Sequence, residues 1–260
     1  MSEELVTLDI KDHIAVVTLN RAGSLNAISS EMAERIRDAF LGLSDNEDAW
    51  VVVLAAAGDK AFCVGADLKE RAGFDLDAFY KNREQIRSMF AAIRETPQPV
   101  VAAPFGFALG GGFELVLSCD LVIAATGTTL GLPETRVGLL PAGGGTQLLT
   151  RKVGVARAKE LIFRGRRFDA EEGHRIGLVT EIVGRDELMG RAMDVARDIC
   201  KSSPVAVREA KRSIDAAMGV PLEQGIEIED ESWEVVIQTQ DRAEGIAAFN
   251  EKREPDWKNR

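Results

Sequence analysis

Short apolar runs recur through the first two thirds of this 260-residue chain, and amphipathic stretches fill most of the last quarter. Residues 5–10 and 13–19 alternate or run apolar with β-branched side chains, which predicts two strands joined by a tight turn. The continuous apolar run over residues 50–57 is typical of a strand buried on both faces. Further strands are expected over residues 100–103, 121–124 and 179–183, and a loop over residues 62–67.

Helical periodicity lies between these strands and dominates beyond Pro141. Ser29 and Ser30 are candidate caps for a helix over residues 31–43, whose apolar positions share one face. Other helices are expected over residues 77–95, 110–118, 155–163, 187–201, 205–218, 222–238 and 242–251. This order predicts an α/β fold with one core, residues 1–195, followed by a helical region, residues 196–260, with apolar faces to bury.

The charge balance argues against nucleic acids and anionic membranes as binding partners. The net charge is −10 and the pI about 4.9, and such a chain repels nucleic-acid phosphates and anionic membrane surfaces. Three widely spaced cysteines, with no apolar leader visible, predict a reducing, cytoplasmic location without disulfides or a metal site. Residues 96–113 are uncharged, but their three prolines and four glycines favour strand and loop over a membrane helix.

Candidate chemistry first appears in the segment Gly110-Gly111-Gly112-Phe113-Glu114. Glycines in the first turn of a helix leave free N–H groups at the positive end of the helix dipole, which suits a phosphate or a developing oxyanion. Glu114 lies one turn in, on the face of Gly111, and its apolar neighbours predict at least partial burial. The alternative is a glycine cluster that only permits close packing, beside a solvated Glu114. The apolar flank favours a functional carboxylate.

A second glutamate, Glu134, follows Pro133 and precedes a glycine-rich segment over residues 141–146. Taken alone, Glu134 is interpreted as a charge that complements a helix N-terminus. Two carboxylates framed by such backbone suggest one acid and one base that act on the same substrate.

The loop over residues 62–67 is a third candidate segment. Its small residues Gly65 and Ala66 could expose another backbone N–H, and Asp67 is a candidate cap for a following helix. Lys60 and Lys69 flank the loop and could meet an anionic group, although solvated surface lysines are the commoner case.

These segments, taken in order, closely resemble the crotonase superfamily, which is the enoyl-CoA hydratase/isomerase family. The resemblance covers nearly the whole chain, because ordered motifs occur at the family's spacings. The motifs are Leu19-Asn20-Arg21, Leu25-Asn26-Ala27, Ala61-Phe62, Gly65-Ala66-Asp67-Leu68-Lys69-Glu70, Ala108-Leu109-Gly110-Gly111-Gly112-Phe113-Glu114-Leu115, Cys119-Asp120, Pro133-Glu134, Leu140-Pro141-Ala142-Gly143-Gly144-Gly145-Thr146-Gln147, Glu244-Gly245, Ala248-Phe249 and Glu251-Lys252-Arg253.

The resemblance implies a spiral of ββα turns, with a helical C-terminal region that builds homotrimers or hexamers made of two trimers. It implies acyl-CoA substrates and no cofactor, because coenzyme A is part of the substrate. The N–H groups of Ala66 and Gly111 would hold the thioester oxygen as an enolate forms. Glu114 would be the base that orients water for attack at Cβ, and Glu134 the acid that delivers a proton to Cα.

The resemblance also implies contacts with coenzyme A. The residues that match the part holding its adenine and phosphates are Leu25, Ala27, Lys60, Ala61, Phe62, Ala66, Asp67, Leu68 and Lys69. Gly111 belongs to the same substrate-binding set. Phe249 and Lys252 match residues that, in this family, reach the coenzyme A site of a neighbouring subunit.

The presence of both glutamates favours an enoyl-CoA hydratase of fatty acid metabolism. An isomerase that works with one glutamate, at the position of Glu134, is an alternative. A branched-chain hydratase is another, because residues 65–71 and 159–163 resemble the methylglutaconyl-CoA hydratase branch. The acyl group stays open. Arg71, Arg83 or Arg87 could pair with a carboxylate at its far end, although solvated helix charges are the favoured interpretation.

The same branch includes a protein that binds AU-rich RNA through a lysine-rich helix, which raises a non-enzymatic alternative. The corresponding residues 29–48 of this chain contain six acidic and two basic side chains, a local balance of −4. Phosphate neutralisation needs the opposite sign, so the sequence argues against RNA binding as a main role.

Overall fold

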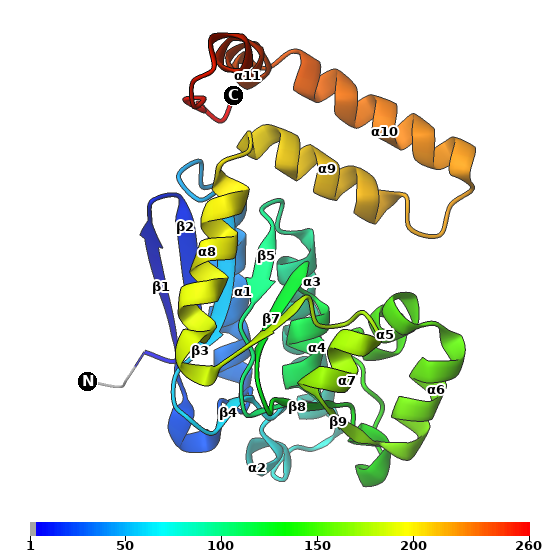
Figure 1. Cartoon of the computed structure of the whole chain (residues 1–260). Helices are drawn as coiled ribbons and strands as arrows, with labels where there is room; N and C mark the ends of the chain where they lie inside the picture. Colours follow the sequence, from blue (N-terminus) through cyan, green and yellow to red (C-terminus); the bar gives the residue numbers. More distant parts are fainter. Residues whose placement is uncertain (1–3) are drawn as a thin grey trace.

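The computed structural model describes residues 4–260 and places a six-stranded sheet beside a four-stranded one (Figure 1). The strands are β1 (Val6–Lys11), β2 (Ile14–Leu19), β3 (Val51–Ala56), β4 (Ala61–Cys63), β5 (Val100–Ala102), β6 (Phe107–Leu109), β7 (Leu121–Ala125), β8 (Thr129–Gly131), β9 (Arg167–Asp169) and β10 (Glu181–Val183). The larger sheet has the order β1-β2-β3-β5-β7-β10, antiparallel between β1 and β2 and parallel elsewhere. The smaller sheet has the order β4-β6-β8-β9, antiparallel between β8 and β9.

The helices lie between and beyond these strands. They are α1 (Ser30–Ser44), α2 (Leu68–Arg71), α3 (Leu76–Glu95), α4 (Gly111–Leu117), α5 (Gly145–Val153), α6 (Val155–Arg164), α7 (Ala170–Arg175), α8 (Leu188–Cys200), α9 (Pro204–Ala216), α10 (Leu222–Ile237) and α11 (Gln240–Glu251). The predicted cap of the first long helix is confirmed, because the Ser29 hydroxyl accepts a hydrogen bond from Met32 N.

Successive strands alternate between the two sheets. After β3, β5 and β7 in the larger sheet, the chain passes into β4, β6 and β8 of the smaller sheet, and helices then return it to the larger one. The returning helices are α2 and α3, then α4, then α5 to α7. This is the predicted spiral of ββα turns, and the α/β fold class is confirmed.

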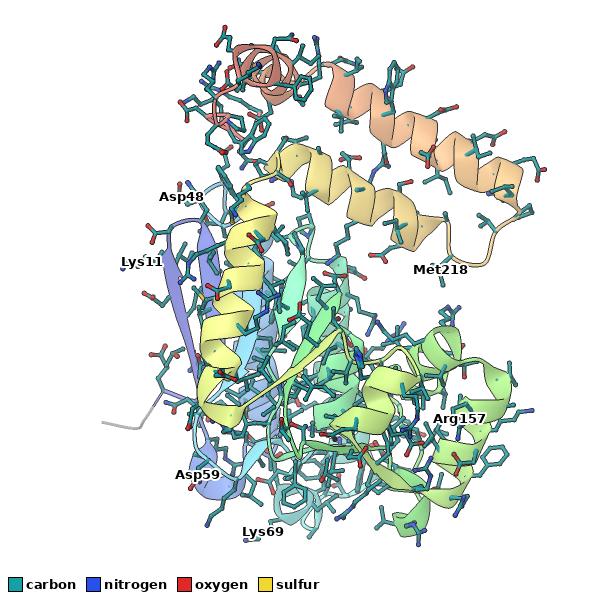
Figure 2. All side chains as sticks on the ribbon, in the orientation of Figure 1. Lys11, Asp48, Asp59, Lys69, Arg157 and Met218 are labelled. Carbon is teal, nitrogen blue, oxygen red and sulfur yellow. The ribbon has the colours of Figure 1, made fainter. Side chains whose placement is uncertain are left out.

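The larger sheet separates two apolar cores, with side chains filling the layers on both sides (Figure 2). Val52 and Leu54 of β3 pack with residues of α1 and α3, whereas Val51 and Val53 pack with residues of α8. Alternate residues of a strand point to opposite faces, so a strand covered on both sides must be apolar throughout. This explains the continuous apolar run that predicted the strand.

The prediction of a loop over residues 62–67 is wrong at its start, because β4 occupies Ala61–Cys63. The strands β6, β8 and β9 and the helices α5 and α7 also lie where the pattern predicts no element. Each of these strands has three residues, too few to show a period of two, and each forms by pairing with strands distant in sequence. The last strand, β10, begins two residues later than expected.

The C-terminal helices differ in how they meet the core. Helix α8 packs on the larger sheet, so the expected division after residue 195 falls inside it. Lys211 attaches α9 to the core, because its ammonium group donates to Asp120 Oδ2 at 2.7 Å and to Gln98 O at 3.0 Å. Helices α10 and α11 stand away from both sheets (Figure 1). Within residues 4–260, no helix is long and apolar enough to cross a membrane.

Candidate active site

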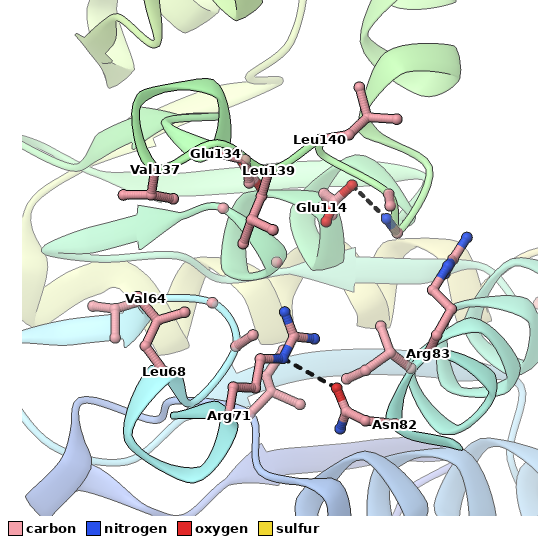
Figure 3. A pocket seen from close by; sticks show the side chains of 18 of the residues that line it. Val64, Leu68, Arg71, Asn82, Arg83, Glu114, Glu134, Val137, Leu139 and Leu140 are labelled. Atoms are coloured by element: carbon pink, nitrogen blue, oxygen red, sulfur yellow. Dashed lines mark hydrogen bonds between the residues drawn. The ribbon is translucent and has the colours of Figure 1, made fainter. Parts of the chain in front are cut away.

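A cavity of about 360 Å³ opens between α2 and α3 on one side and the start of α4 on the other (Figure 3). Much of its lining is apolar, including Ile28, Leu68, Ile86, Phe90, Leu139 and Leu140. Among the described residues, four charged side chains line it. Glu114 and Glu134 lie on one side and Arg71 and Arg83 on the other. An apolar cavity with a few polar groups is typical of a small-molecule site.

Glu114 lies in the first turn of α4 and is only 4% exposed, which confirms its predicted burial. Its Oε1 accepts hydrogen bonds from Gly143 N at 2.7 Å and from Gly145 N at 2.8 Å. Burial raises the pKa of Glu114, while these two backbone N–H groups act in the opposite direction. The two bonds also fix the carboxylate in one orientation, as a reacting group requires.

Glu134 begins a short 3₁₀ turn, Glu134–Val137, directly after Pro133. Its Oε2 is buried and has no hydrogen-bond partner within residues 4–260. Burial raises the pKa of Glu134 to about 7, and the nearby charge of Glu114 contributes. A carboxyl group with this pKa exists in both protonation states near neutral pH, which suits proton transfer.

Two neighbouring backbone N–H groups belong to residues that line the cavity. Gly111 N starts α4, and Ala66 N precedes the cap of α2. Neither donates a hydrogen bond to any described residue. A Cβ atom built on Gly111 would lie 3.6 Å from Ala66 N, so the two groups are neighbours. Together they offer two donors to one oxygen atom in the cavity.

Glycines allow this close approach of α4 to the loop after β4. A Cβ on Gly112 would lie 2.0 Å from Cys63 O, and Gly65, at φ +92°, packs its Cα against Gly111. The glycine cluster does permit close packing, but the alternative of a solvated Glu114 is wrong, because that side chain is buried. Gly112 is required for packing, whereas Gly111 presents a free N–H group beside Glu114.

Comparison with known proteins identifies the family. Residues 9–260 match the family Enoyl-CoA hydratase/isomerase. The chain belongs to this family. It is 39% identical over 249 residues to mouse mitochondrial methylglutaconyl-CoA hydratase, covering 94% of this chain and 79% of that protein. It is 41% identical to mouse mitochondrial enoyl-CoA hydratase domain-containing protein 2, covering 94% of this chain and 84% of the relative.

Solved structures of the family have the same fold. The crystal structure of enoyl-CoA hydratase from Bacillus anthracis superimposes with a TM-score of 0.97 at 41% sequence identity, covering 99% of this chain and 100% of that one. The spiral of ββα turns and the helical C-terminal region are thus those of the crotonase superfamily.

The structure brings five of the sequence-predicted site residues together. Glu114, Glu134, Ala66, Gly111 and Leu68 all line the cavity. Four segments of the chain supply them, since the first turn of α4, the turn after Pro133, the loop before α2 and the start of α2 meet there.

The other residues predicted to contact coenzyme A do not line this cavity. Lys60 and Lys69 are exposed at the surface, whereas Ala61 and Phe62 are buried in β4. The Phe62 ring is fully buried in the core, so its side chain presents no surface to a ligand.

Asp67 caps α2, as predicted, because its Oδ1 accepts hydrogen bonds from Lys69 N and Glu70 N. Its Oδ2 also forms a salt bridge with Arg21 at 2.6 Å, and this bond lowers the pKa of Asp67. The same arginine donates to Ala27 O at 2.9 Å. Arg21 therefore holds the segment of Leu25 and Ala27 beside the start of α2.

Phe249 and Lys252 lie at the end of α11, on the opposite side of the molecule from the cavity (Figure 1). Phe249 is 83% exposed, and Lys252 takes a left-handed conformation with φ +57°. Within one chain, these residues therefore do not reach the glutamates.

Several residues of the site have hydrogen-bonding roles that the local sequence does not indicate. Gly143 and Gly145 were part of a motif, but nothing local indicates that their N–H groups bind Glu114, which lies about thirty residues earlier. Asn82 is buried and holds Arg71, although a polar residue in a polar helix gives no such signal. Arg71 and Arg83 were favoured as solvated charges, whereas both line the cavity.

Proposed function

We propose that the protein is an enoyl-CoA hydratase, which adds water across the trans-2 double bond of an enoyl-CoA thioester. The observation that carries the proposal is the meeting, in one cavity, of two carboxylates and two backbone N–H groups that have no partner among residues 4–260. Addition of water to a conjugated thioester needs a base that deprotonates water, an acid that protonates Cα, and hydrogen-bond donors to the enolate oxygen.

In the proposed reaction the thioester oxygen accepts hydrogen bonds from Ala66 N and Gly111 N. Glu114, fixed by Gly143 and Gly145, takes a proton from water as the water oxygen attacks Cβ. The electron pair of the double bond moves toward the thioester oxygen, where negative charge develops. The two N–H groups stabilise this charge more than they stabilise the neutral substrate, and the barrier falls.

Glu134 then gives its proton to Cα, and the enolate collapses to the 3-hydroxyacyl thioester. Its raised pKa supports this role, because a buried carboxyl group with no partner for Oε2 holds a proton near neutral pH. The cycle leaves Glu114 protonated and Glu134 ionised, so one proton must pass between them through solvent before the next turnover.

The proposed reaction uses no metal or redox cofactor, because coenzyme A enters and leaves with the substrate. We also propose that the protein forms homotrimers or pairs of trimers, in which Phe249 and Lys252 approach the coenzyme A site of a neighbouring subunit. The exposed apolar side chains of α10 and α11 support such an assembly. They include Leu222, Trp233, Ile246 and Phe249, each more than half exposed.

Crotonyl-CoA hydration tests the assignment, followed as loss of the ultraviolet absorbance of the enoyl thioester. Glu114→Gln and Glu134→Gln should each lower kcat by about 10²- to 10⁴-fold, the range for loss of a general acid or base. A glutamine amide oxygen can still accept the bonds from Gly143 and Gly145, so the fold should persist. Glu171→Gln, at an exposed position on α7, is the matched control and should keep wild-type activity. A double variant as fast as wild type would refute the proposal.

Double-bond isomerisation is the second candidate, because it needs only one carboxyl group that both accepts and donates a proton. The pKa of about 7 for Glu134 suits that cycle as well. Isomerisation would be the better assignment if wild type converts 3-enoyl-CoA to 2-enoyl-CoA but does not hydrate the product. Retention of that conversion in Glu114→Gln would strengthen it.

A further inference from the structure

Two arginines occupy the wall of the cavity that faces the glutamates. Arg71 ends α2 and Arg83 lies in α3, and both side chains line the cavity. Figure 3 shows their guanidinium groups across the cavity from Glu114 and Glu134. The rest of this wall is largely apolar, formed by residues such as Leu68 and Ile86. Positive charge is therefore concentrated on one side of the cavity.

Arg71 is held in place by neutral groups. Its Nε donates to Asn82 Oδ1 at 3.1 Å, and the amide of Asn82 in turn donates to Ser30 Oγ at 2.9 Å. Asn82, which makes both of these contacts, is only 3% exposed. The neighbouring carboxylate of Glu70 accepts hydrogen bonds from Ser30 N instead. The terminal nitrogens of Arg71 donate no hydrogen bond to any described residue.

Neither arginine forms an ion pair with residues 4–260, although Arg71 is half-buried. Arg166, by contrast, is partly buried and forms salt bridges to Glu160 at 2.9 Å and Glu172 at 2.7 Å. Burial lowers the pKa of Arg71, while Glu70 and Glu114 act in the opposite direction. Partial burial of a cation without a counterion costs free energy, which a bound anion would recover.

The position of the arginines relative to the reacting groups indicates which anion fits. If the proposed function is correct, the thioester lies at Ala66 and Gly111, and the double bond lies beside Glu114. The acyl group then extends into the cavity that the arginines line. We propose that the preferred substrates are enoyl-CoA thioesters whose acyl group carries a second carboxylate, bound by Arg71 and Arg83. The guanidinium of Arg71, oriented through Nε, still offers its outer edge to such a carboxylate.

Matched substrate pairs test this selectivity. Glutaconyl-CoA differs from crotonyl-CoA by one carboxylate on the terminal carbon, and 3-methylglutaconyl-CoA differs from 3-methylcrotonyl-CoA in the same way. In at least one pair, wild-type kcat/KM should be higher for the carboxylated member. Arg71→Gln and Arg83→Gln should each lower that ratio by about tenfold, as expected for loss of a charged hydrogen bond. Arg87→Gln is the matched control, because this exposed arginine of α3 does not line the cavity. It should leave the ratio unchanged.

Equilibrium binding separates this inference from the proposed function. Glutaryl-CoA and butyryl-CoA are saturated, cannot be hydrated and differ by one carboxylate. Calorimetry should show tighter binding of glutaryl-CoA to wild type, with the preference lost in Arg71→Gln and Arg83→Gln. This result would support the carboxylate site even if no enoyl-CoA were hydrated.

Hydration of both members of each pair with equal kcat/KM would overturn the inference and leave the hydratase proposal intact. Binding of free coenzyme A is the last control, because its phosphates are a second source of negative charge that the arginines could bind. Its Kd should not change in either arginine variant. If the arginine variants bound free coenzyme A more weakly than wild type, by the same factor as they bind glutaryl-CoA more weakly, the arginines would contact the coenzyme. This result would refute the carboxylate site.

Discussion

Glu114 and Glu134 line one cavity but have different surroundings. The carboxylate of Glu114 accepts two backbone hydrogen bonds, which favour its ionised form, whereas Oε2 of Glu134 is buried and has no partner in the described part of the chain. The charge of Glu114 also raises the pKa of Glu134. Burial raises the pKa of both carboxyl groups, so they differ mainly in their hydrogen bonds, and the proposed roles are Glu114 as base and Glu134 as acid.

The pH dependence of kcat/KM should reflect this arrangement. The proposed acid, Glu134, is active only when protonated, so kcat/KM for crotonyl-CoA should fall as the pH rises through about 7. Well above that value the decline should approach about tenfold per pH unit. Steady-state kinetics over a range of pH would measure it. A flat profile between about pH 6 and about pH 9 would contradict the assignment of Glu134 as the acid.

The same residue should make folding stability depend on pH. Glu134 has a raised pKa in the folded protein, about 7 against 4.5, so the folded state binds more protons between these values. The free energy of unfolding therefore falls as the pH rises through this window. Glu134→Gln should be more stable than wild type by about 3 kcal/mol at about pH 8, with a smaller difference near about pH 5. Thermal unfolding at both pH values measures the effect.

Glu172→Gln is the control for that measurement, because its effect on stability should have the opposite sign. The pKa of Glu172 is lowered, chiefly by its hydrogen bonds with Arg166. Its contribution to stability is present above the ordinary pKa of a glutamate and is lost as the pH falls through the lowered value. Glu172→Gln should therefore reduce Tm at about pH 8 and have less effect in acid. A stabilising effect of both substitutions would contradict this account of the two carboxylates.

At the scale of elements, the site depends on how closely α4 approaches β4. The helix begins with glycines, and Gly112 lies against the carbonyl of Cys63. This contact sets the position of Gly111 N relative to Ala66 N, two residues of different turns of the spiral. The proposed oxyanion donors are therefore aligned by packing between elements rather than by one local motif.

Gly112→Ala should disrupt this alignment. The added Cβ would lie 2.0 Å from Cys63 O, so α4 must move, and overpacking of this kind typically costs about 1–3 kcal/mol. We expect a lower Tm together with a loss of hydration activity in the remaining folded protein. Gly190→Ala on α8 is the control, since its Cβ meets no atom within 4 Å. Alanine favours a helix over glycine, so that variant should be as stable as wild type or more so. Equal Tm for the two variants would contradict the packing argument.

At the scale of the whole molecule, α10 and α11 expose apolar surface that the chain itself does not cover. Trp233 is 59% exposed and Phe249 83% exposed, and both elements stand away from the sheets (Figure 1). Exposed apolar surface of this extent is typical of an interface between subunits.

Light scattering coupled to size-exclusion chromatography should give the mass of a trimer or a hexamer. Phe249→Glu places a charge in the proposed interface, so it should shift the mass toward the monomer. Leu41→Glu changes a leucine on α1 that is 53% exposed and serves as the control, with no expected change in mass. A monomeric wild type would refute the proposed assembly.

Several parts of the fold and site could be predicted from the sequence because their signals are local. The apolar run of β3 predicts burial on both faces of the strand, and the apolar neighbours of Glu114 predict that its side chain is buried in α4. The cap of α2 at Asp67 and the ordered motifs of the family are equally local. Such signals need only a few neighbouring residues, so periodicity and spacing were sufficient.

Only the tertiary structure decided the features that depend on residues far apart in sequence. The three-residue strands of the smaller sheet form by pairing with one another, and Glu114 is oriented by N–H groups about thirty residues later. The side chain of Arg71 lines the cavity because Asn82 and Ser30 hold it, although its local pattern favours a solvated charge. The sequence by itself determined which glutamates and glycines are present, whereas folding determined their hydrogen bonds, burial and protonation. Those properties belong to the assembled surroundings rather than to any one segment.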